Sequence, residues 1–261
     1  MPALPKLALA KETPVADDHA LAVLTVVLPA LLSLAWLWFV RRFDRAHPEP
    51  RWLVGVVFVL GALPVLPAGL LEYLYGVLSP YLNPTLSTLG GQPRALPLSI
   101  AVFTLVVGVT EEAAKLCAAV FAARRKEFDE PVDGIVYAVT ASLGFAALEN
   151  VSYFASGRLS PALVCARAFM TVPAHVFFAA IWGYGLGARI LHKRRIFLPF
   201  FLLSALAHGA FDALLSTEGT GLVAVVLVVG LGALFMVLVR KALRFGVVTE
   251  RAPVDRAARA L

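Results

Sequence analysis

Long apolar stretches alternate with short polar segments along the whole chain. A helix that crosses the hydrocarbon core of a bilayer needs about 20 predominantly apolar residues, and seven stretches of the chain meet this requirement. The predicted spans are residues 21–40, 52–78, 96–123, 132–155, 161–191, 197–215 and 221–239. The pattern therefore predicts an all-α fold, a polytopic membrane helix bundle of about seven transmembrane helices.

Composition and charge support this class of protein. Hydrophobic residues make up 60% of the 261 residues and charged residues only 15%, which is unlike a soluble domain of this length. The net charge of +6 is concentrated in a few loops, so it indicates membrane orientation rather than nucleic-acid binding. We therefore expect the lipid bilayer as a partner and no nucleic acid, while the pattern indicates no particular oligomeric state.

Basic residues gather in alternate loops. They follow the first, third, fifth and seventh spans as Arg41, Arg42, Arg45, Arg51, Arg124, Arg125, Lys126, Arg189, Lys193, Arg194, Arg195, Arg240, Lys241 and Arg244. The intervening loops carry only Arg94 and Arg158. Because Lys and Arg are retained in cytoplasmic loops, the pattern predicts a multi-pass protein of the inner (plasma) membrane with its N-terminus outside. Residues 1–20 are then an N-terminal tail, 21–244 the transmembrane domain and 245–261 a cytoplasmic C-terminal tail.

The third span carries Glu111, Glu112 and Lys115 in the middle of its apolar run. Three charged residues near a helix centre cost roughly 8–10 kcal/mol, whereas the large apolar residues of the span return roughly 5 kcal/mol. This span therefore needs partners within a bundle, and its charges indicate a functional site. Lys115 shares a helix face with both glutamates, so we expect it to neutralise one carboxylate and leave the other free.

The fourth and fifth spans add polar groups at helical spacing. Phe145, Glu149 and Tyr153 are each four residues apart and form one stripe of the fourth span. His175 lies two residues after Pro173 in the fifth span, where a proline is expected to bend the helix.

The fifth and sixth spans supply the remaining features. Arg167 is expected to pair with a carboxylate or to extend towards the interface. Gly183 and Gly187 form a small-xxx-small pair that permits close helix approach. His208 and Asp212 are four residues apart on the sixth span and share a face.

Three glutamates, two histidines and one aspartate thus lie on four separate spans. A carboxylate beside a histidine can accept a proton from water, and the same groups can hold a divalent metal that lowers the pKa of bound water. A polar side chain can also stabilise a tetrahedral oxyanion. These are the requirements for peptide hydrolysis inside a membrane.

Each group also has a purely structural interpretation. Glu111 and Lys115 could form an ion pair, His208 and Asp212 a hydrogen-bonded clamp, and His175 a bridge between helices. Their joint occurrence on four consecutive spans favours chemistry, because structural clamps alone would not require so many costly polar insertions.

The chain resembles the PrsW family of bacterial intramembrane proteases, which belongs with the Abi/CAAX-prenyl endopeptidases and the γ-secretase subunit APH-1. The resemblance is carried, one block per helix, by Glu111-Glu112-Ala113-Ala114-Lys115 (EExxK), Asp133–Tyr137, Phe145 with Glu149 (FxxxE), Arg167 through Pro173 to His175, and His208 with Asp212 (HxxxD). It implies an intramembrane endopeptidase with its core at about residues 100–215. The implied roles are catalytic for Glu111, Glu112 and His175, metal-binding or oxyanion-stabilising for Glu149, His208 and Asp212, and ion-pairing for Lys115 and Arg167.

The resemblance also implies a membrane-anchored protein substrate, and among such substrates it points to anti-sigma factors. Relatives are described both as metalloproteases and as glutamate-dependent enzymes, so zinc is an expected cofactor only in the first form. A non-catalytic scaffold or chaperone similar to APH-1 is the alternative function, and the intact glutamate pair argues against it. A proton-coupled transporter is a weaker alternative, because no inverted repeat is visible.

Overall fold

The computed structural model describes residues 18–45, 47–82, 97–155, 159–215, 217 and 219–251. Within these ranges the chain is helical and contains no β-strand. The elements are α1 (Asp18–Val40), α2 (Arg51–Ala62), α3 (Val65–Leu82), α4 (Pro97–Ala123), α5 (Pro131–Tyr153), α6 (Pro161–Ala166), a π-helical turn (Arg167–Thr171), α7 (Val172–His192), α8 (Phe197–Leu215) and α9 (Gly221–Arg251). Residues 1–17 of the predicted tail, the linker with Arg94, Arg158 and residues 252–261 lie outside the described residues.

The predicted membrane bundle is confirmed. Six stretches are long and apolar enough to cross a bilayer: Leu21–Val40, Arg51–Leu74, Pro131–Tyr153, Pro161–His192, Phe197–Leu215 and Gly221–Phe245. Helix α4 is the seventh long helix, and its 27 residues reach about 40 Å at 1.5 Å per residue. It contains the three charged residues and packs against α8, α5 and α2. The chain is therefore a multi-pass membrane protein.

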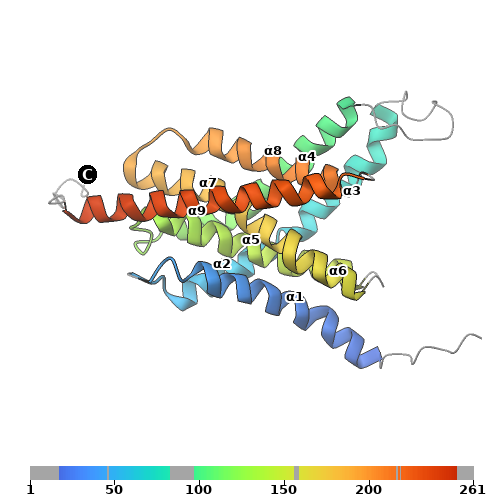
Figure 1. The fold of residues 1–261 in the computed structure, drawn as a ribbon, viewed down its shortest axis with the longest axis horizontal. Coiled ribbons are helices and arrows are strands. Elements are labelled where there is room, and N and C mark those ends of the chain that lie inside the picture. The colour runs from blue at the N-terminus through green and yellow to red at the C-terminus, as the bar shows by residue number, and fades with distance from the viewer. Residues whose placement is uncertain are drawn as a thin grey trace, which may run out of the picture.

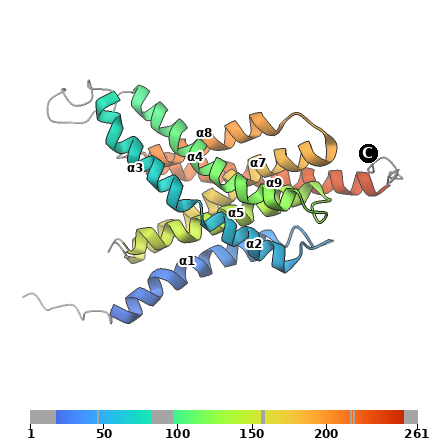
Figure 2. The same ribbon diagram turned by 180° about the vertical axis from the view of Figure 1, so that it is seen from behind.

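Helix α5 runs through the centre of the bundle, between α7 on one side and α1 and α2 on the other (Figures 1 and 2). In the apolar 18-residue window of each span, 94% of the α5 residues are buried inside the bundle, against 22% of the α1 residues. A helix that is apolar on all sides is expected at such a position. Polar side chains on α5 can consequently meet partners from several other helices.

Glycines allow the helices that carry the polar groups to approach closely. A Cβ atom on Gly134 of α5 would lie 2.3 Å from the carbonyl oxygen of Gly183 on α7, and one on Gly187 would lie 2.4 Å from that of Pro131. The predicted close approach at Gly183 and Gly187 is confirmed. A Cβ on Gly108 of α4 would likewise lie 1.9 Å from the carbonyl oxygen of Ala205 on α8.

Two predicted spans depart from regular α-helix near prolines. The second span is interrupted at Leu63 and Pro64, between α2 and α3, as the prolines in this span indicated. The predicted fifth span is confirmed as one stretch, Pro161–His192, and a π-helical turn lies within it between α6 and α7. Pro173 has no N–H to donate to the preceding turn and its ring crowds the carbonyl there, which accounts for a widened turn at this place. Turns of this kind are frequent at functional sites.

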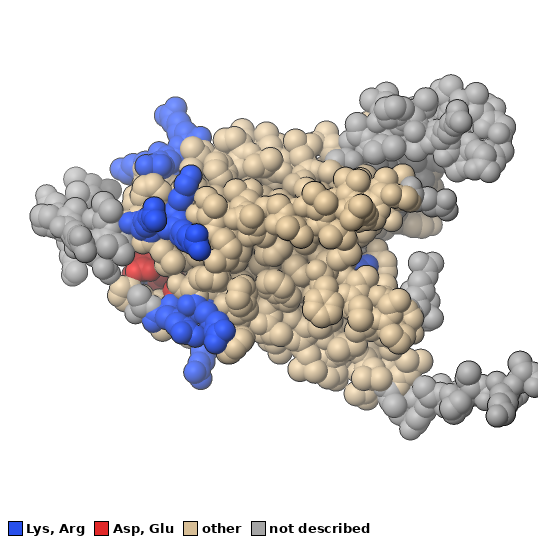
Figure 3. All heavy atoms as spheres, in the orientation of Figure 1, with Lys and Arg blue, Asp and Glu red and all other residues tan. Residues whose placement is uncertain are grey.

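Basic side chains gather at one end of the bundle. In Figure 3 nearly all the visible Lys and Arg atoms lie at the end where α9 runs out towards the C-terminus. Exposed basic residues follow α1, α4 and α7 there, including Arg42, Arg125 and Arg194. This end is called the basic end below.

Candidate active site

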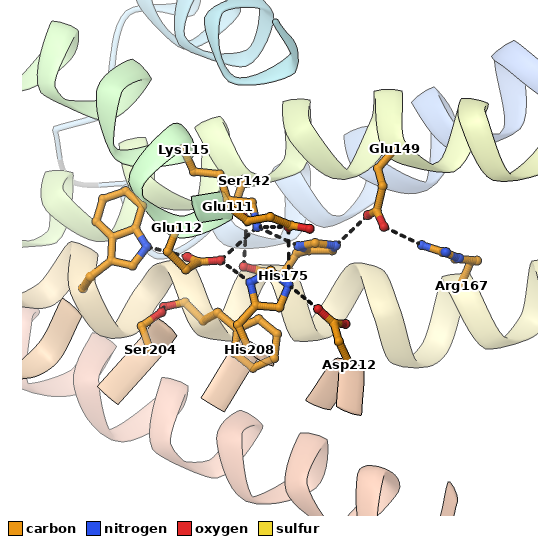
Figure 4. Close-up of polar contacts among 12 residues, drawn as sticks. Glu111, Glu112, Lys115, Ser142, Glu149, Arg167, His175, Ser204, His208 and Asp212 are labelled. Carbon is orange, nitrogen blue, oxygen red and sulfur yellow. Dashed lines mark hydrogen bonds and ion pairs between the residues drawn. The ribbon is translucent and has the colours of Figure 1, made fainter. Parts of the chain in front are cut away.

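Four helices and the π-helical turn bring all eight sequence-predicted residues into one network (Figure 4). The network comprises Glu111, Glu112 and Lys115 of α4, Glu149 of α5, Arg167 of the turn, His175 of α7, and His208 and Asp212 of α8. The structure thus joins residues up to about one hundred positions apart in sequence, such as Glu112 and His208.

Lys115 lies at the centre of this network and is fully buried. Its ammonium donates to Glu111 Oε2 and to Glu112 Oε1, each at 2.9 Å, and lies 3.2 Å from His175 Nδ1. It also lies 4.4 Å from the centre of the Phe145 ring. The expectation that Lys115 would leave one carboxylate free was wrong, because the side chain reaches between both glutamates.

Glu112 is fully buried and bonded at both oxygens. Its Oε2 accepts a hydrogen bond of 2.7 Å from the indole N–H of Trp182, and its Oε1 lies 2.9 Å from the Lys115 ammonium and 2.6 Å from His208 Nδ1. Glu112 is therefore held rigidly and orients the imidazole of His208.

His208 is oriented from two sides. Its ring stacks on Phe178 at a centroid distance of 4.7 Å. Because Nδ1 faces Glu112, Nε2 faces the other two carboxylates, at 3.4 Å from Glu111 Oε2 and 3.4 Å from Asp212 Oδ2.

His175 is oriented in the same manner by a different carboxylate. Its Nε2 lies 2.9 Å from Glu149 Oε2, and Glu149 Oε1 accepts from Arg167 at 3.3 Å. The Arg167 guanidinium lies 3.5 Å from the centre of the Tyr153 ring. The predicted pairing of Arg167 with a carboxylate is confirmed, and the arginine is itself buried.

One set of ligand atoms in this network fits a metal ion. Glu111, His175 and His208 each offer a ligand atom, these atoms lie within 4.8 Å of one another, and all three residues are buried. Two imidazoles and one carboxylate are the donor set of several catalytic zinc sites. The additional carboxylate on each histidine is the kind of outer partner that fixes a metal-binding imidazole.

A polar cavity of about 170 Å³ adjoins the network, lined by Glu72, Val107, Glu111, Glu149, Tyr153, Arg167, Thr171, Asp212 and Leu215. A polar cavity of this size has room for several water molecules. The cavity brings Glu111 and Asp212 into reach of water, whereas Glu112 is absent from its lining.

Sequence reasoning missed two members of the site. Trp182 lies seven residues after His175, two helical turns further on the same face, and this spacing was the available signal. Glu72 of α3 lines the cavity. One of its carboxylate oxygens is buried without a hydrogen-bond partner.

These features define a class of protein, a polytopic α-helical membrane enzyme with a buried glutamate–histidine centre suited to hydrolysis. The chain belongs to the PrsW family: the family model described as "PrsW family intramembrane metalloprotease" matches residues 49–240. The match includes α2 and α9 as well as the motif-bearing helices, and begins after α1. The chain is accordingly an intramembrane peptide hydrolase.

Several curated relatives carry the name "Protease PrsW". Those of Oceanobacillus iheyensis and Geobacillus kaustophilus are each 31% identical over 193 residues, which cover 72% of this chain and 80% and 77% of the relatives. That of Clostridioides difficile is 32% identical over 206 residues, covering 75% of this chain and 79% of the relative. No solved structure matches the chain significantly.

Proposed function

We propose that the chain is a metal-dependent endopeptidase that cleaves membrane-anchored proteins within the bilayer, with Glu111, His175 and His208 as the metal ligands. The observation that carries this proposal is the buried group of three ligand atoms within 4.8 Å of one another. Zinc suits this donor set, and the family is described as a metalloprotease family.

The other residues of the network support this centre. Glu149 and Glu112 each hold one histidine, so that the imidazoles have fixed orientations before any substrate arrives. When bound, a divalent metal lowers the pKa of water to about 7 and polarises a carbonyl oxygen. Asp212 lies beside His208 and lines the cavity, where its carboxylate can accept a proton.

A metal-free form has one specific observation in its favour. The Lys115 ammonium lies among Glu111, Glu112 and His175 and supplies positive charge where a metal would otherwise do so. In this form Glu111 accepts the proton of the attacking water and His175 helps to orient it. Glu111 is essential in both forms, as a ligand in one and as the base in the other.

The position of the site sets where cleavage occurs. Helices α8 and α5 both begin at the basic end. His208 lies 11 residues after the first residue of α8, or about 17 Å along the helix. Glu149 lies 18 residues after the first residue of α5, or about 27 Å along the helix. If the basic end faces the cytoplasm, the N-terminus is outside and cleavage falls in the outer half of a hydrocarbon core about 30 Å thick. Anti-sigma factors, the substrate class that the resemblance indicated, stay a prediction.

Purified protein in detergent allows metal content and cleavage to be measured separately. Bound zinc is counted by elemental analysis, and cleavage is followed with a quenched fluorescent single-span peptide. We expect about one bound zinc per chain in the parent protein and no bound zinc in His175→Ala or His208→Ala. In Glu111→Gln we expect the cleavage rate to fall by about 10²–10⁴-fold. Lys126→Met, an exposed loop change, is the matched control and should keep both properties.

A strong chelator separates the two forms. Inactivation that zinc reverses supports the metal-dependent form. Full activity after complete chelation, with Glu111→Gln and His175→Ala still inactive, supports the metal-free form instead. If both substitutions leave cleavage within about threefold of the parent, less than the loss of a base produces, the assignment of these residues is wrong.

A further inference from the structure

A second group of acidic residues lies at the basic end, far from the active site. Asp44 and Glu49 belong to the loop between α1 and α2, while Glu130 and Asp133 lie at the start of α5. Asp44, Glu49 and Asp133 are at most 4% exposed. In Figure 3 the visible acidic atoms lie at this end, between two groups of basic atoms.

Three of these carboxylates are close enough to share one ion. One oxygen each from Asp44, Glu130 and Asp133 lies within 4.8 Å of the other two. Calcium binds oxygen at 2.3–2.6 Å, so two oxygens on one ion lie at most about 5 Å apart. The three oxygens therefore fit around a single cation of this size, and a carboxylate set is the donor type that hard cations prefer.

One of the two carboxylate oxygens of Asp44 has no hydrogen-bond partner among the described residues. Its Oδ2 accepts the backbone N–H of Glu49 at 2.9 Å. Its Oδ1 is buried and has no hydrogen-bond partner, although the side chain is 98% buried and belongs to the close group of three. Such an oxygen costs free energy unless a partner satisfies it.

Positive side chains do not fill this place. The Arg41 guanidinium donates to the backbone carbonyl of Glu49, and His47 pairs with Glu130 at the exposed side. Among the described residues, no Lys or Arg forms an ion pair with Asp44 or Asp133. Burial raises the pKa of Asp44 to about 6, although the backbone N–H of Glu49 and the charges of Arg41 and His47 act in the opposite direction.

We propose that Asp44, Glu130 and Asp133 bind one hard divalent cation of the calcium–magnesium class. The ion fastens the loop after α1 to the first turn of α5, and thereby fixes the central helix at the basic end. Asp44 precedes the region 49–240 that matches the family, whereas Glu130 and Asp133 lie within it. The site is independent of the proposed active-site metal.

The test measures thermal stability after all metal has been removed. Protein is treated with chelator, transferred to pH 8, where Asp44 is ionised, and melted with and without Ca²⁺ or Mg²⁺ while tryptophan fluorescence is followed. At an ion concentration about 100 times the Kd, we expect the melting temperature to rise by roughly 5–10 °C. The rise should persist in His175→Ala, which loses a proposed active-site ligand, and be absent in Asp44→Asn.

The behaviour of Asp44→Asn without metal separates ion binding from a structural role. The asparagine can still accept the N–H of Glu49, and an uncompensated carboxylate is removed, so this variant should melt at or above the wild-type temperature in chelator. Asp129→Asn, an exposed neighbour outside the group of three, is the matched control and should respond to ions as the parent does. If Asp44→Asn does not fold, Glu130→Gln provides the same comparison.

The proposal is overturned if neither Ca²⁺ nor Mg²⁺ raises the melting temperature of the wild-type protein. It is also overturned if the ions raise the melting temperature of Asp44→Asn, or of Glu130→Gln in its place, as much as that of the wild type.

Discussion

Lys115→Met replaces the buried ammonium by an apolar side chain of similar length and should destabilise the protein severely. The ammonium is shared by Glu111 and Glu112 at 2.9 Å each and by His175 Nδ1 at 3.2 Å. Removing one partner of a buried ion pair costs about 3–5 kcal/mol. Two carboxylates lose their partner here, so we expect the upper part of this range, which corresponds to a melting temperature lower by roughly 10–20 °C for a chain of this size.

The assay is thermal melting in detergent, followed by tryptophan fluorescence, because Trp182 donates directly to Glu112. Chelator is present throughout, so that no bound metal can replace the missing charge. Lys126→Met is the control for loss of one lysine, and it should melt within a few degrees of the parent because its side chain is exposed. The double substitution Lys115→Met, Glu112→Gln should recover part of the loss. A Lys115→Met protein that melts within about 2 °C of the parent, a shift worth less than about 1 kcal/mol, would refute the compensation of buried charge by Lys115.

Three further outcomes follow from the geometry. Gly183→Ala should lower the melting temperature, because its Cβ would lie 2.5 Å from a backbone oxygen of α5, whereas Gly55→Ala, with nothing within 4 Å, should not. Trp182→Phe removes the N–H that Glu112 Oε2 accepts and should cost about 1–3 kcal/mol in unfolding free energy, measured by denaturant titration in detergent. Reporter fusions at Arg125 and Arg194 should report the cytoplasmic side, and an external signal at either would reverse the proposed orientation.

The arrangement of spans was predictable because the bilayer fixes the length of each apolar run. The grouping of the site was predictable for a related reason. Glu111 with Lys115, and His208 with Asp212, are spaced by one helical turn, and a charged group inside a membrane must turn away from lipid towards other helices. Charged side chains on different helices are therefore expected to face one another inside the bundle, regardless of how the loops connect those helices.

Details that depend on tertiary contacts were not predictable. Pro173 indicated a bend, but the widened turn also positions Arg167 against Glu149, which lies on another helix. Trp182 is one aromatic residue in an apolar run, and only its spacing from His175 hinted at a polar contact. Glu72 faces the cavity because the chain breaks between α2 and α3, and the direction of the helix after such a break cannot be inferred from the proline alone.

The charges of the site favour the metal-bound form over the metal-free form. The network contains four carboxylates and two permanent cations, namely Glu111, Glu112, Glu149 and Asp212 against Lys115 and Arg167. With both histidines neutral and these carboxylates ionised, the network carries two net negative charges, each of which costs about 2.5–3.5 kcal/mol or more inside a bilayer. Glu72 on the cavity wall adds a further carboxylate. Two protons or one divalent cation would balance the two charges of the network. Protons would neutralise the carboxylates on which hydrolysis depends, whereas a divalent cation at the proposed ligands Glu111, His175 and His208 would balance the charge and leave these carboxylates ionised. If purified protein without metal is active at neutral pH, the metal-free form is correct. The site would then have to tolerate this excess negative charge or neutralise it with protons.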